Sequence, residues 1–94
     1  MIIVDTHAHI YHADETRYPM IPEPHRPDEG VGTIEHLRKN MRASGIDRVT
    51  LVQTGSAYKW DNRLVGDIAL SNREDMVGVC NLDSMNPASV DELT

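Results

Sequence analysis

The sequence predicts an α/β fold in which parallel strands alternate with helices, and three observations support this prediction. Apolar runs rich in β-branched residues are typical of strands, and they occupy residues 2–5, 46–53 and 76–82. Helical periodicity appears between them, at residues 33–45 and 62–71, and a further helix start appears at Asn86–Pro87. Each strand is therefore followed by a helix, and this order produces a parallel sheet.

The first strand is expected at Ile2–Asp5, with Thr6 as its furthest extent. A long irregular stretch, Ile10–Gly32, comes next and holds four of the chain's five prolines. Loops of this length inside compact domains are usually lids or binding segments.

Two helices are then expected around the second strand. The first takes Thr33 as its N-cap and ends at Gly45, with an apolar stripe at helical spacing formed by Ile34, Leu37 and Met41. The second follows a loop at residues 54–61, with Asp61 as its N-cap and an inner face formed by Leu64, Val65 and Ile68. Asn86 is the predicted N-cap of a third helix, with Pro87 as its first residue.

Three strands with their helices on one side leave the other face of the sheet bare. The strands are apolar on both faces, so this piece cannot bury its own sheet. The sequence also stops within the predicted third helix. We therefore expect residues 1–94 to be the N-terminal part of one larger barrel domain, about three βα units long.

The most informative motif is Asp5-Thr6-His7-Ala8-His9, which directly follows an apolar run. Alternate residues of a strand lie on one face, so Asp5, His7 and His9 are expected to point the same way. The two imidazoles, about 7 Å apart along a strand, could then converge on one ion or one substrate group. The alternative is a pair of histidines in a polar loop. Zinc sites normally take at least three protein ligands, so the motif is incomplete.

The chain resembles the amidohydrolase superfamily of TIM (β/α)₈ barrels. More narrowly, it is similar to the amidohydrolase-related branch that holds dicarboxylate lactonases and carboxymuconate-semialdehyde-type decarboxylases. Four segments carry it: residues 3–10 with the His-x-His motif, Arg17-Tyr18-Pro19, residues 43–53, and Trp60-Asp61-Asn62-Arg63. A full barrel takes roughly 250 residues. The resemblance therefore implies that the remaining ligands, and the aspartate that acts as general base, lie beyond Thr94.

By this resemblance, His7 and His9 would help to hold a divalent metal, most often zinc, although some lactonase-like members use the same histidines to bind substrate without a metal. Asp5 would either orient an imidazole or cap the strand. Arg17 and Tyr18 could bind a carboxylate, or Arg17 could be a solvated loop residue. Gln53, at the end of the second strand, is either a substrate contact or a turn cap. No catalytic residue is expected within these 94 positions.

The function predicted from the resemblance is hydrolysis of a lactone or related carboxylated ring. The alternatives are a metal-dependent decarboxylase and a truncated fragment that catalyses nothing. A net charge of −6 argues against nucleic acid as a partner, so a small carboxylated molecule is expected instead. The single cysteine and the lack of a signal or membrane segment suggest a cytoplasmic protein. Whether the whole protein is a homo-oligomer is left open.

Overall fold

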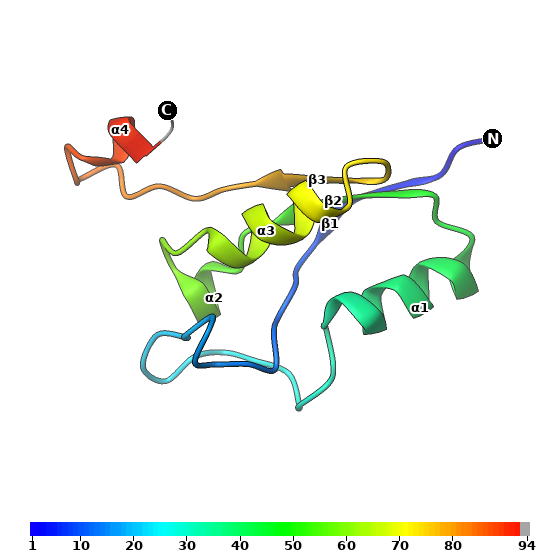
Figure 1. The fold of residues 1–94 in the computed structure, drawn as a ribbon, viewed down its shortest axis with the longest axis horizontal. Coiled ribbons are helices and arrows are strands. Elements are labelled where there is room, and N and C mark those ends of the chain that lie inside the picture. The colour runs from blue at the N-terminus through cyan, green and yellow to red at the C-terminus, as the bar shows by residue number, and fades with distance from the viewer. Residues whose placement is uncertain (93–94) are drawn as a thin grey trace.

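The computed structural model describes residues 1–92, apart from the side chains of Val90 and Glu92. Its three strands form one parallel sheet in the order β1-β2-β3, as the alternation of elements predicts. The strands are β1 (Val4–Ala8), β2 (Arg48–Val52) and β3 (Met76–Val79). Their carboxyl ends meet at one edge, which we call the carboxyl edge of the sheet (Figure 1).

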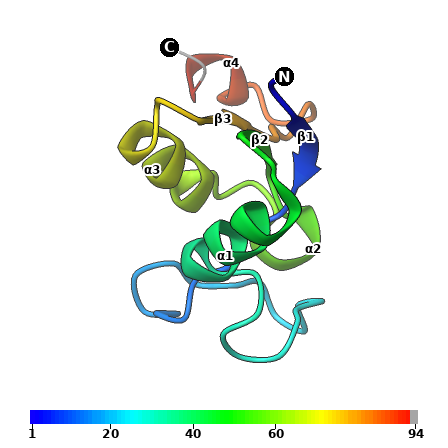
Figure 2. The same ribbon diagram turned by 90° about the vertical axis from the view of Figure 1, so that its right-hand side faces the viewer.

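The helices are α1 (Ile34–Ser44), α2 (Gly55–Tyr58), α3 (Arg63–Ser71) and α4 (Ser89–Glu92). Both views place α1 and α3 on the same side of the sheet (Figures 1 and 2). The core lies between that face and these helices, and its members include Met41, Val49, Leu51, Leu64 and Val65.

Capping fixes the ends of α1 as predicted. The side chain of Thr33 accepts a hydrogen bond from the backbone N–H of His36, and Gly45 adopts φ 70°, which favours glycine. Arg38 joins α1 to the turn between α3 and β3, because its guanidinium donates to the Asp75 carboxylate and to Asn72 Oδ1. The bond to Asp75 raises the pKa of Arg38 above its usual value.

The strand boundaries differ from those predicted. β1 begins at Val4 rather than Ile2 and runs through His7, because hydrogen bonding to the next strand sets its extent. Ile3 precedes β1 and is held by Asp47, whose backbone N–H donates to Ile3 O over 2.9 Å. β3 ends at Val79 rather than Leu82, because Asn81 bonds to the side chain of Asn62 instead of to a strand.

Three helix predictions also need correction. The segment predicted as loop 54–61 contains α2, a single turn that buries Ala57 and Tyr58. The N-cap of α3 is Asn62 rather than Asp61, although Asp61 Oδ1 still accepts from the backbone N–H of Arg63 at 3.2 Å. α4 begins at Ser89, because the Asn86 side chain closes a turn with the N–H of Ala88 before the helix starts.

The face of the sheet away from α1 and α3 is open, as the sequence predicts. Val4, Val77 and Val79 are 48%, 58% and 45% exposed there. These residues alternate with the helix-facing positions of their strands, so apolar side chains are exposed on the open face as well as packed on the other. We call this surface the open face of the sheet.

The stretch from Ile10 to Gly32 has no helix or strand, as expected, yet it is packed against the rest of the chain. Ile10 and Tyr18 are buried, and the N–H of Ile21 donates to Ala57 O of α2 over 2.8 Å. It therefore forms a layer packed beside α2 (Figure 1). Among the described residues, no helix is long and apolar enough to cross a membrane.

Candidate functional site: a histidine pair at the carboxyl edge

A bulge in β1 decides which side chains of the motif share a face. Asp5 pairs with Val49 and Ala8 pairs with Leu51, so β1 has one residue more than β2 between the two pairs. Val49 and Leu51 are buried against the helices, which places Asp5 and Ala8 on the helix side. His7 and His9 flank Ala8 and lie on the open face. The prediction that Asp5 shares their face is therefore wrong, because the bulge interrupts the alternation.

The imidazoles of His7 and His9 converge. Their Nε2 atoms lie 3.3 Å apart, and their rings meet edge to face with centroids 4.9 Å apart. His9 Nδ1 lies 2.9 Å from the carbonyl oxygen of Val52, at the end of β2. A carbonyl only accepts hydrogen bonds, so in a neutral His9 the proton is on Nδ1 and the lone pair is on Nε2. The strand end therefore presents His9 Nε2 as an acceptor or ligand.

This spacing fits two ligands of one tetrahedral ion. Zinc–nitrogen bonds of about 2.0–2.1 Å at a tetrahedral angle place the two nitrogens about 3.3–3.4 Å apart. Residues 1–92 contain no group of three or more histidine, cysteine or carboxylate side chains placed to hold a metal. The pair thus fits part of a metal site, and further ligands would have to come from elsewhere.

Asp5 contacts the backbone rather than an imidazole. Its Oδ1 accepts a hydrogen bond from the N–H of His7 at 3.0 Å. Of the two roles considered for Asp5, this contact corresponds to the cap. This hydrogen bond holds the backbone of β1 at the bulge and so fixes the backbone position of His7.

Gln53 is buried at the end of β2, where it is only 2% exposed. Its Nε2 donates to Lys59 O at 3.1 Å and to Asp61 O at 2.8 Å, so it holds the loop that leads into α3. Within residues 1–92 its Oε1 has no hydrogen-bond partner. The observed bonds are those of a loop cap, and a contact with substrate stays a prediction.

Arg17 and Tyr18 are not brought to the histidine pair. Tyr18 is buried, and its hydroxyl donates to Asp67 Oδ2 of α3 over 2.5 Å. This bond raises the pKa of Tyr18. Arg17 is exposed, with its guanidinium carbon 5.2 Å from the centre of the Tyr18 ring. In the described part of the chain, no hydrogen bond or ring contact connects either residue with His7 or His9.

Two asparagines at the carboxyl edge were not among the predicted site residues. Asn62 and Asn81 bond to each other at the point where β3 ends. The signal for Asn81 was a polar residue near the carboxyl end of the apolar run at residues 76–82. No sequence signal pairs it with Asn62.

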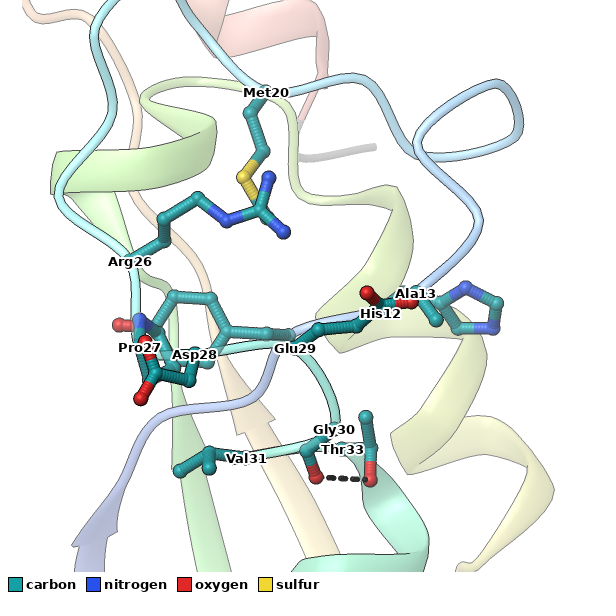
Figure 3. Close-up of a pocket in the computed structure, with 11 residues that line it drawn as sticks. His12, Ala13, Met20, Arg26, Pro27, Asp28, Glu29, Gly30, Val31 and Thr33 are labelled. Carbon is teal, nitrogen blue, oxygen red and sulfur yellow. Dashed lines mark hydrogen bonds between the residues drawn. The ribbon is translucent and has the colours of Figure 1, made fainter.

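The hollow drawn in Figure 3 belongs to the long loop and not to the histidine pair. Its walls come from residues between Tyr11 and Thr33, including Met20, Arg26 and Pro27. A volume of about 10 Å³ gives space for about one water molecule. It is too small to hold an organic substrate.

The arrangement of strands and helices matches part of a TIM-barrel hydrolase. The solved structure that it matches is described as a probable 2-pyrone-4,6-dicarboxylic acid hydrolase from Acinetobacter baumannii with citric acid bound. The TM-score is 0.75 at 17% sequence identity, over 99% of this chain and 33% of that one. The chain thus spans a third of the relative's length, and at this identity the likeness shows the fold. No family model matches the chain, and no curated protein matches it significantly.

Proposed function

We propose that residues 1–94 form the N-terminal third of an amidohydrolase-type barrel whose complete protein hydrolyses a lactone or related carboxylated ring. The observation that carries the proposal is the convergence of His7 and His9 Nε2 atoms at the carboxyl end of β1. Active sites of such barrels lie at the carboxyl ends of the strands. The open apolar face supports the same proposal, because the interior of a barrel is packed with side chains.

In this proposal His7 and His9 are two ligands of a divalent metal, and zinc suits their spacing. Such an ion would polarise the scissile carbonyl or lower the pKa of bound water. The chain's own contribution is orientation: the Val52 carbonyl holds His9, and Asp5 holds the backbone of His7. The general base would lie outside residues 1–94.

The remaining predicted contacts have separate roles in this proposal. Arg17 would meet a carboxylate of the substrate, since its guanidinium is exposed and forms no ion pair within residues 1–92. Tyr18 would hold the loop that carries Arg17. Gln53 would shape the loop between α2 and α3 through the carbonyls of Lys59 and Asp61.

Turnover of 2-pyrone-4,6-dicarboxylate by the complete gene product, followed by ultraviolet absorbance, tests the proposal. His7→Asn and His9→Asn should each lower kcat/KM by about 100-fold or more, because even groups that only orient a ligand are worth 10–100-fold. His25→Asn is the matched control, since His25 is exposed and its side chain makes no hydrogen bond to the described part of the chain. Full activity of both variants, or no hydrolysis of any carboxylated lactone by the wild type, would overturn the proposal.

Metal removal tests the assignment of the two ligands. Dialysis against a chelator should abolish turnover, and bound zinc measured by elemental analysis should fall in His9→Asn but not in His25→Asn. If the metal-free protein keeps its turnover while His9→Asn remains inactive, the histidines contact the substrate directly.

A further inference from the structure

Two residues beyond the end of β3, the backbone of Asn81 is held by the side chain of Asn62. The N–H of Asn81 donates to Asn62 Oδ1 at 2.9 Å, and Asn62 Nδ2 donates to the Asn81 carbonyl oxygen at 2.8 Å. The same Nδ2 reaches Trp60 O at 3.1 Å, so Asn62 is itself fixed. The side chain of Asn62 therefore supplies the hydrogen bonds that a neighbouring strand would supply. Asn81 has a defined backbone position beyond Val79, the last paired residue of β3.

If the alternation of β3 is extended by two residues beyond Val79, the Asn81 side chain falls on the open face. Gly78 lies against α3, where an added Cβ would stand 2.8 Å from Val65 Cγ1. Val77 and Val79 occupy the alternate positions and are exposed on the open face. Asn81 continues the odd-numbered series, the same series as these two valines.

The amide of Asn81 lies at the carboxyl edge and has no side-chain partner. A Cβ built on Gly55, the first residue of α2, would be 3.4 Å from Asn81 Nδ2. That contact places the amide above the end of β2. In the described chain the Asn81 side chain makes no hydrogen bond, so both of its N–H donors and its oxygen are free to bind a ligand.

The histidine pair and Asn81 flank the same strand. His9 bonds to Val52 O on one side of β2, and the N–H of Gln53 donates to Val79 O of β3 on the other. Neighbouring strands lie about 4.8 Å apart, so the ends of β1 and β3 are separated by about 10 Å. This distance suits a six-membered ring with a carboxylate on the side opposite its reacting carbonyl.

We propose that Asn81 is a substrate-binding residue. Its amide donates to the distal carboxylate of a ring whose reacting carbonyl lies at His7 and His9. This inference rests on the proposed function and adds a specificity determinant to the same site. A neutral amide binds a carboxylate through directed N–H donors and without the strong field of an arginine, so it selects by geometry more than by charge.

The test compares Asn81→Leu and Asn81→Asp in the complete protein. Leucine has a similar volume but no donor, and loss of one hydrogen bond to a charged group should raise KM for the dicarboxylated lactone about 10- to 100-fold. kcat should change little, and KM for an analogue without the distal carboxylate should be unaffected. Asn81→Asp should raise KM further by repulsion. Asn40→Leu, an exposed substitution on α1, should leave both KM values unchanged.

Calorimetric binding of citrate separates this inference from the proposed function. If the wild type hydrolyses no lactone, the proposed function fails, and weaker citrate binding by Asn81→Leu would still support the site. If the wild type hydrolyses the lactone but KM and citrate affinity are unchanged in both Asn81 variants, Asn81 is not a ligand residue and the hydrolase proposal stands. A wild type that binds neither molecule overturns both.

Discussion

Tyr18 joins the long loop to α3 through one part-buried hydrogen bond to Asp67. Tyr18→Phe should lower the free energy of unfolding of the complete protein by about 1–2 kcal/mol, because Asp67 then loses its donor. The bond raises the pKa of Tyr18, so its contribution is complete below about pH 10 and is lost as pH rises through the higher folded-state value. Urea unfolding at pH 8 and above pH 10 measures both effects.

Tyr11→Phe provides the control for this experiment, since the Tyr11 hydroxyl makes no hydrogen bond within residues 1–92. It should change stability little at either pH. The wild type and Tyr18→Phe should have similar free energies of unfolding above the folded-state pKa of Tyr18. If the difference persists there, the phenol proton is not what stabilises the loop.

At the scale of single residues, the sequence predicts the histidine pair but not its surroundings. His7 and His9 are two positions apart, so a local rule of alternation brings them to one face. Asp5 departs from that rule because the bulge depends on pairing with β2. The bond between Asn62 and Asn81 joins residues 19 positions apart, and only the folded chain brings them together.

At the scale of elements, the approach of α3 to β3 depends on a residue without a side chain. A Cβ on Gly78 would stand 2.8 Å from Val65 Cγ1 and 3.4 Å from Ala69 Cβ. Gly78→Ala should therefore cost about 1–3 kcal/mol, as the helix is pushed from the strand. Chemical denaturation of the complete protein would measure this loss.

Gly66→Ala, on α3 itself, is the matched substitution. An added Cβ there meets nothing within 4 Å, and alanine is the better helix former, so stability should rise by about 0.5–1 kcal/mol. Equal effects of the two substitutions would contradict the close packing of α3 on β3.

Most elements could be predicted from periodicity, but several of their ends could not. The stripe of Ile34, Leu37 and Met41 repeats at helical spacing, and Thr33 and Gly45 cap that helix as expected. α2 has only one turn, too short to show a period, so it was predicted as loop. Strand ends depend on where a partner stops, which explains the shifts in β1 and β3.

At the scale of the whole molecule, the open face sets the behaviour of residues 1–94 on their own. Val4, Val77 and Val79 remain in contact with water, so the isolated chain should bind a hydrophobic dye and melt over a broad range. The complete protein should bind less dye and melt sharply. A cooperative two-state melt of residues 1–94 without dye binding would contradict the proposal that they are one third of a barrel.

The sequence by itself determined the order of strands and helices, the parallel sheet, the open apolar face and the spacing of His7 and His9. All of these follow from patterns that span a few neighbouring residues. The tertiary structure decided that Asp5 faces the helices, that Tyr18 holds α3, that Gln53 holds a loop and that Asn81 is clamped at the carboxyl edge. These outcomes depend on strand pairing and on hydrogen bonds between residues 6 to 49 positions apart, which no pattern of neighbouring residues encodes.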